Sequence, residues 1–195
     1  MSWLPRRWPR GAWLVRQGER PQGFLIIKCG LVAARHAGPD GVDRVVGLAG
    51  RGFLFGQHAS QGLPGVAGLQ ALDLVTGCEL AFELLDAETA RDAPRLLMQF
   101  NRRSMAGLLA WSHVTRLPRL EARLAAALQL LAQTQEPGLL RLPSQAVLAE
   151  LLGVTRESVS RGLRQLEARG LLSRQGGQAV LLHEAALRKL LRARL

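Results

Sequence analysis

The chain has 195 residues, of which 48% are apolar, and a formal net charge of +11. This length allows one globular domain or two small ones. Two cysteines, Cys29 and Cys78, are too few for a disulfide framework, so we expect a cytoplasmic protein. No apolar run reaches the roughly 18 residues of a membrane span, and the N-terminal segment lacks the sustained apolar stretch of a signal peptide. These features argue against a membrane protein and a disulfide-held secreted scaffold.

The positive charge is concentrated in the second half of the chain. Residues 1–90 contain 9 lysines and arginines against 8 acidic residues, whereas residues 91–195 contain 17 against 7. Only Lys28 and Lys189 are lysines, and arginine is the better bidentate partner for phosphate and guanine. A compositional bias of the genome would explain the excess of arginine, but not the difference between the halves. The second half therefore has the charge of a domain that binds a polyanion.

The first half contains short apolar segments separated by glycine-rich turns. We expect strands at Ala12–Arg16, Phe24–Lys28, Leu31–His36 and Asp43–Leu48, and two more within Gly68–Phe82. Strands at this spacing predict a small antiparallel barrel or sandwich. No element is predicted in the glycine-rich loop at 56–68. Three tryptophans near the N-terminus are expected to pack onto the barrel rather than form a ligand cage: Trp3, Trp8 and Trp13. We assign residues 1–90 to a sensor-like β-barrel domain.

A long helix is expected from Ala93. Its apolar stripe recurs at steps of three and four residues: Leu96, Leu97, Phe100, Ser104, Leu108, Trp111 and Val114. A helix of about 24 residues is roughly 36 Å long, and packing against its copy in a second subunit is the natural way to bury the stripe. The alternative is that it lies on its own barrel. Because proline disrupts a helix interior, Leu117-Pro118 ends the helix. We assign residues 91–118 to a dimerisation helix and hinge.

Residues 143–166 have the pattern of two short helices joined by a tight turn. Ser144 is the expected N-cap of the first helix, Gly153 ends it with a left-handed residue, and Thr155 caps the second. Their apolar faces consist of Val147, Leu148, Leu151 and Leu152 on the first helix and Val159, Leu163 and Leu166 on the second. An ordinary helical hairpin with solvated charges would show the same pattern.

A β-hairpin is expected directly after these helices. The segments Leu171–Arg174 and Ala179–Leu182 flank a turn with a Gly-Gly pair at 176–177, which is a hairpin signal. A helix-turn-helix followed by a hairpin is a winged helix, whose second helix fits the major groove of double-stranded DNA. Further helices are expected over Arg119–Gln133 and Glu184–Leu195. We assign residues 119–195 to a winged helix-turn-helix DNA-binding domain.

The second helix of this motif carries the residues that we expect to contact DNA. Positions 156, 157, 160 and 161 are neighbours on one helix face. Arginine is matched to guanine O6 and N7, and glutamate to the cytosine amino group. The predicted DNA-binding residues are Ser144, Thr155, Arg156, Glu157, Ser160, Arg161 and Arg164.

From about Arg7 to the C-terminus, the arrangement resembles the CRP/FNR family of bacterial transcription regulators. The resemblance rests on RGxxLVxxGE at 10–19, LIIxxGLV at 25–32 and the helix-turn-helix. The FNR branch is the closer match in QALD at 70–73, CELAFE at 78–83, EARLAA at 121–126 and ExxSR at 157–161, whereas Arg156 resembles the CRP-type residue. The family implies an α+β fold: an N-terminal antiparallel β-barrel of the cyclic-nucleotide-binding jelly-roll type, a long dimerisation helix and a C-terminal winged helix-turn-helix. It also implies a homodimer on a near-palindromic site with a TGA-like core, and RNA polymerase as a partner.

The sequence departs from the family's ligand-binding patterns. Members that bind cyclic nucleotides use a Gly-Glu pair and a later Arg-Ser/Thr-Ala, where this chain has Gly56-Gln57-His58 and, near the arginine position, Ala67-Gly68-Leu69. We therefore expect that it does not bind cAMP.

The cysteines and histidines do not form a recognisable cofactor site either. FNR itself holds an iron–sulfur cluster with four cysteines, of which only Cys78 has a counterpart here, and one thiolate cannot hold such a cluster. Cys29 is expected to pack as a small buried residue, with a two-thiol redox switch as the alternative. His36, His58, His113 and His183 show no metal-ligand spacing, and only His58 is a candidate haem or metal ligand. We predict no cofactor and no metal, and the effector is not defined.

Taken together, the sequence predicts a sequence-specific DNA-binding transcription regulator and not an enzyme. One alternative is a small-barrel metal enzyme, but the chain has no His-x-His, no CxxC and no identifiable Ser-His-Asp set. The other is a non-regulatory DNA-binding protein, such as a replication or partition factor, whose winged helix would look the same.

Overall fold

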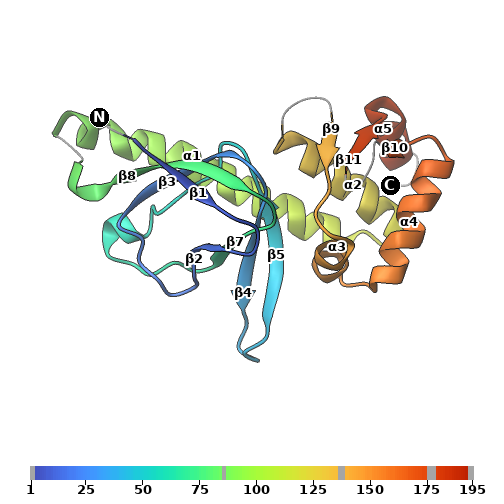
Figure 1. The fold of residues 1–195 in the computed structure, drawn as a ribbon, viewed down its shortest axis with the longest axis horizontal. Coiled ribbons are helices and arrows are strands. Elements are labelled where there is room, and N and C mark those ends of the chain that lie inside the picture. Colours follow the sequence, from blue (N-terminus) through green and yellow to red (C-terminus); the bar gives the residue numbers. More distant parts are fainter. Residues whose placement is uncertain (1–2, 85–86, 136–138, 175–178, 193–195) are drawn as a thin grey trace. The chain divides into compact units, whose positions relative to one another are not determined.

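The computed structural model describes residues 3–84, 87–135, 139–174 and 179–192. The chain divides into two compact units, Met1–Leu108 and Leu109–Leu195 (Figure 1). The long helix α1 (Ala87–Arg116) contributes residues to both. Within the described ranges, no helix is long and apolar enough to cross a membrane.

The first unit is built from two four-stranded antiparallel sheets with the orders β1-β8-β3-β6 and β2-β7-β4-β5. Their strands are β1 (Leu4–Trp8), β2 (Trp13–Val15), β3 (Gly23–Cys29), β4 (Val32–Ala37), β5 (Asp43–Ala49), β6 (Leu54–Phe55), β7 (Gly68–Ala71) and β8 (Val75–Ala81). The predicted antiparallel β domain is confirmed, and four expected strands, now β2 to β5, shift by at most one residue at either end. Residues 56–68, for which no element is predicted, contain the short 3-10 helix Ala59–Gln61; a second one lies at Phe82–Leu84.

Strand β1 is absent from the sequence prediction. Its sequence is LPRRW, and four of its five residues are exposed, so it shows no alternation of buried and exposed positions. It forms an edge of its sheet by pairing with β8, with Leu4 opposite Glu79 and Trp8 opposite Val75. Proline and charged residues are typical of edge strands. The strand is therefore defined by a partner about 70 residues away and not by its own pattern.

Strand β3 contributes buried apolar side chains on both of its faces, each to a different cluster of the first unit's core. Leu25 and Ile27 contribute to the main cluster, which contains Val15, Leu25, Ile27, Val32, Ala49, Phe55, Leu69, Ala71 and Val75. Phe24 points to the opposite face, since successive strand residues alternate. There it packs with Leu54 and Leu80 against Ile26, Phe82 and, from α1, Phe100. Phe24 and Phe82 meet edge to face, with ring centroids 5.0 Å apart.

The residues of the predicted apolar stripe on α1 do not share one environment. Phe100 packs on the barrel of its own chain, whereas Trp111 and Val114 are each 3% exposed. Leu108 remains 50% exposed. The prediction of one continuous face for a second subunit is therefore wrong for Phe100, whose position fits the alternative. The helix ends at Arg116, just before Leu117-Pro118, as predicted.

Besides the end of α1, the described part of the second unit contains four helices and a three-stranded sheet. They are α2 (Leu120–Gln133), β9 (Leu139–Arg141), α3 (Gln145–Leu152), α4 (Arg156–Ala168), β10 (Leu172–Arg174), β11 (Ala179–Leu182) and α5 (Glu184–Arg192). The sheet has the order β10-β11-β9. The helix-turn-helix and the strands of the wing are confirmed. Strand β9 is not predicted, while the turn at 175–178 and residues 193–195 of the expected last helix lie outside the described residues.

Candidate nucleic-acid interface

The turn between α3 and α4 is defined by short-range hydrogen bonds. The Ser144 hydroxyl oxygen accepts from the Val147 N–H at 3.3 Å, which caps the start of α3. Gly153 ends α3 in the left-handed region at φ 63°, where residues with a Cβ are strained. The Thr155 Oγ1 then accepts from the Ser158 N–H at 3.2 Å. All three predicted caps are confirmed, and they fix where α4 begins.

Helix α4 has one buried face and one charged face. Val159 and Leu166 are fully buried, and Leu163 is 4% exposed. The opposite side contains the exposed Arg156, Glu157, Arg161 and Arg164 and the half-buried Ser160. Because successive helix residues are about 100° apart, these five residues span an arc of about 140°. The predicted residues of α4 therefore share one surface, with Thr155 exposed at its N-terminal end.

The arginines of this surface differ from those of the barrel in their partners. Among the described residues, Arg156, Arg161 and Arg164 form no ion pair or side-chain hydrogen bond. In the barrel, by contrast, three arginines form ion pairs with carboxylates: Arg6 with Glu79 at 2.6 Å, Arg35 with Asp43 at 2.7 Å and Arg44 with Asp40 at 2.7 Å. The guanidinium groups of α4 are thus available to an external anion, while Glu157 lies in the first turn, where the helix dipole favours a negative charge.

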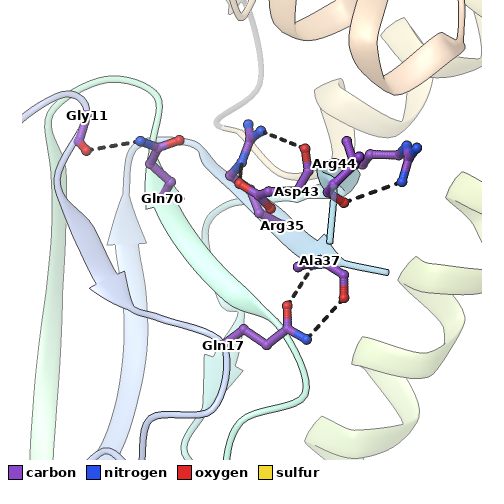
Figure 2. A network of polar contacts seen from close by, with 8 residues as sticks. Gly11, Gln17, Arg35, Ala37, Asp43, Arg44 and Gln70 are labelled. Atoms are coloured by element: carbon purple, nitrogen blue, oxygen red, sulfur yellow. Dashed lines mark hydrogen bonds and ion pairs between the residues drawn. The ribbon is translucent and has the colours of Figure 1, made fainter. Parts of the chain in front are cut away.

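The polar residues of the first unit bond to its backbone and to one another (Figure 2). Gln17 exchanges hydrogen bonds with the backbone of Ala37, and the Gln70 amide donates to the Gly11 carbonyl at 3.2 Å. Arg44 forms an ion pair with Asp40, and its hydrogen bond is the main reason why the pKa of Asp40 falls from 3.8 to about 2. Asp73 accepts from the Leu31 N–H at 2.8 Å. Gln70 and Asp73, the first and last residues of the QALD segment, therefore hold neighbouring backbone segments by hydrogen bonds.

The loop at Gly56-Gln57-His58, which the resemblance places at the ribose-binding position, also forms hydrogen bonds within its own segment. The Gln57 side chain donates to the Leu54 carbonyl at 3.0 Å, and the Ser60 hydroxyl donates to the Gln57 carbonyl at 2.7 Å. His58 is exposed. In the described part of the chain, no polar or charged residue is buried. The side chains buried between the two sheets are consequently apolar.

The cysteines and tryptophans are placed partly as expected. Cys29 is exposed, so the prediction that it is buried is wrong; a register shift after Ile27 places it at the end of β3. Cys29 lies opposite Thr76, and the half-buried Cys78 lies opposite Ile26, so the two thiols are diagonal neighbours. Trp8 packs against the core, as expected, whereas Trp3 is 38% exposed. Trp13 lies under the guanidinium group of Arg16, a contact that is not predicted. No group of three metal-ligating side chains comes together among the described residues.

Each of the two units is similar to a known protein domain family. Residues 5–89 match the cyclic nucleotide-binding domain and residues 122–190 match the Crp-like helix-turn-helix domain. A CRP-family transcriptional regulator from Thermus thermophilus is 25% identical, with 96% of each chain covered and a TM-score of 0.73. FixK2 from Bradyrhizobium japonicum shares the fold at 19% identity, with 97% and 98% covered and a TM-score of 0.82. No curated protein matches the chain in sequence.

These matches define a regulator with a cyclic-nucleotide-binding-type β domain followed by a Crp-like helix-turn-helix. The chain belongs to the CRP/FNR family of transcription regulators.

Two residues near the DNA-binding helices are missing from the predicted site. Glu121 forms an ion pair with Arg169, and Arg123 donates to the Leu152 carbonyl at 2.9 Å. The sequence contains a signal for them, because they are charged residues in an otherwise Ala- and Leu-rich helix. Their partners are tertiary neighbours that the sequence does not identify.

Proposed function

We propose that the protein is a homodimeric regulator that binds DNA sequence-specifically through α4. The observation that carries the proposal is the arc of polar side chains on α4, with three arginines that have no partner within the described residues. Specific readout requires guanidinium groups that are free to form bidentate hydrogen bonds with guanine.

We assign the reading of bases to the N-terminal half of α4. Arg161 and Arg156 would contact guanine, Glu157 would accept from a cytosine amino group, and Ser160 would accept or donate to either. Arg164 lies one turn further along α4, Thr155 caps the start of α4 and Ser144 caps the start of α3. We assign these three residues to phosphates, which position the protein without specifying sequence. The FNR-like ExxSR pattern favours a half-site with a TGA-like core, with Arg156 adding an upstream guanine.

Dimerisation through α1 is the second part of the proposal. Met98, Met105, Leu108 and Leu109 are exposed by 74%, 60%, 50% and 63%. Met98 and Met105 are seven residues apart, and Leu108 and Leu109 follow after three and four, which is the spacing of a coiled-coil seam. A second copy of α1 would cover these side chains and bring two α4 helices to the two half-sites.

The barrel is proposed to bind no cAMP. Gln57 is held by its own loop, and the space between the sheets contains apolar side chains. A cyclic phosphate needs a cation, and none is buried in the described part of this unit. We propose that the protein acts with RNA polymerase in the cytoplasm, under a signal other than cAMP.

The test of this function is genome-wide occupancy of the protein in its own cells. A regulator should occupy many sites upstream of genes, and the occupied sites should share a near-palindromic motif. Expression of the adjacent genes should change when Arg161→Ala replaces the wild type. Occupancy confined to a replication origin or a centromere-like region would contradict the proposal and favour a replication or partition factor.

A further inference from the structure

Helix α2 contacts the end of α3 and the end of α4 through residues close to its own N-terminus. The Arg123 Nη1 donates to the carbonyl of Leu152, the last residue of α3, at 2.9 Å. The last four carbonyls of a helix have no partner inside the helix, and the Gly153 N–H donates to the carbonyls of Ala149 and Glu150. Arg123 therefore ties the end of α3, and with it the turn leading into α4, to α2.

A second contact holds the far end of α4. Glu121 of α2 forms an ion pair with Arg169, the residue that follows the last turn of α4. The Glu121 side chain is 18% exposed and that of Arg169 is 45% exposed, so the pair is partly shielded from solvent. Partial shielding weakens the screening that makes fully exposed pairs nearly worthless.

Between these two points, the Leu124 side chain of α2 packs directly against the backbone of α4 at Gly162. Gly162 is buried in the middle of α4, and a Cβ at this position would collide with the Cδ1 of Leu124, which is fully buried. The three contacts come from Glu121, Arg123 and Leu124, within four residues of α2, and all of them lie in the second unit. They hold the end of α3, which leads into α4, and the centre and end of α4 itself.

We propose that Glu121 and Arg123 are positioning residues that set the orientation of α4 for base readout, an inference that rests on the proposed function of α4. Hydrogen bonds to base edges require heavy-atom distances of about 2.7–3.2 Å and good alignment. Coulomb attraction to phosphates changes only slowly with distance. A small rotation of α4 therefore weakens binding to the specific site while binding to unrelated DNA persists.

Glu121→Gln separates this role from simple electrostatics. The substitution removes a negative charge from a domain that binds a polyanion, so electrostatics alone predicts tighter binding to every sequence. The positioning role predicts weaker binding to the selected site and equal or tighter binding to random duplex. We expect the ratio of specific to non-specific affinity to fall roughly tenfold, which corresponds to about 1.4 kcal/mol. Glu83→Gln, which removes the same charge from an exposed position in the first unit, is the charge-matched control and should leave the ratio within about twofold.

Arg123 is tested by three variants. Arg123→Met should lower the ratio roughly tenfold, while Arg123→Lys, which keeps a charge and one donor for the Leu152 carbonyl, should recover most of it. Arg119→Met removes the same charge from an exposed position just before α2 and should lower both affinities alike. Equal effects of Arg123→Met and Arg119→Met on both DNAs would overturn the proposal.

A measurement without DNA distinguishes failure of this inference from failure of the proposed function. In the free protein, amide hydrogen exchange across residues 153–158 should accelerate in Arg123→Met and stay at the wild-type rate in Arg119→Met. Unchanged exchange in Arg123→Met refutes the positioning role even if the wild type binds a specific site. If Arg123→Met does not fold, Arg123→Lys and Glu121→Gln decide by the same two readouts. If the wild type binds all sequences alike, the proposed function fails, and exchange alone then decides whether Arg123 holds the turn.

Discussion

The substitution Leu108→Arg should convert the protein from a dimer to a monomer. Leu108 is 50% exposed in the single chain and lies between the exposed Met105 and Leu109 on α1. In the proposed dimer its uncovered half would pack against the same helix of the partner. An arginine there would place two positive charges close together in an apolar seam.

The size of the effect follows from the exposed area. Fully burying a leucine side chain contributes about 1.5–3 kcal/mol, so the exposed half of Leu108 contributes about half of that per subunit and about 1.5–3 kcal/mol per dimer. A buried charge without a partner costs about 3–5 kcal/mol more. Even the lower limits together exceed the roughly 4 kcal/mol that raises a dissociation constant a thousandfold. A micromolar dimer would become undetectable.

Sedimentation velocity at micromolar concentration measures this directly. The wild type should sediment with twice the 21.2 kDa chain mass and Leu108→Arg with one chain mass. Leu63→Arg is the matched control, because Leu63 is 51% exposed but lies in a loop of the barrel. A dimeric Leu108→Arg, or equal dissociation by Leu63→Arg, would refute the placement of the interface on α1.

Three further predictions concern the barrel and the caps. Calorimetry with millimolar cAMP or cGMP should show no saturable heat, and a micromolar dissociation constant would contradict the interpretation of Gln57. Thr155→Ala should lower the free energy of unfolding by about 1 kcal/mol, because it removes the cap on the Ser158 N–H, while Thr155→Ser should not; equal stability of both variants would disprove that role. The folded-state pKa of Asp40 is below its usual value, so its pair with Arg44 contributes stability above about pH 4, and this is lost as the pH falls through about 2. A carboxyl titration by NMR should move from about 2 toward 3.8 in Arg44→Gln, and an unchanged midpoint would rule out Arg44 as the cause.

The parts of the fold that the sequence predicts are those with local signals. Ser144, Gly153 and Thr155 mark the ends of α3 and α4 by bonds within three residues or by a single backbone angle. The exposed face of α4 follows from the spacing of Val159 and its buried neighbours. Whether that face contacts bases depends on a molecule outside the chain and stays a prediction.

The parts that the sequence does not predict depend on distant partners. Strand β1 exists because β8 provides its partner, and the periodicity of α1 does not say that Phe100 meets the barrel while Leu108 stays uncovered. Cys29 follows the apolar run of β3, but a register shift exposes it. For Glu121 and Arg123, charge on a helix predicts solvation, and only the tertiary fold shows their partners.

The central claim is that α4 reads a DNA sequence, and selection of bound duplexes from a random pool tests it most directly. The wild type should select two half-sites about one helical turn apart, centre to centre. Arg161→Ala should lose information mainly at one base pair per half-site, with a loss of roughly 1–3 kcal/mol in affinity. If the wild type selects no motif, or if Arg161→Ala selects the same motif with equal information at every position, then α4 does not read bases through Arg161.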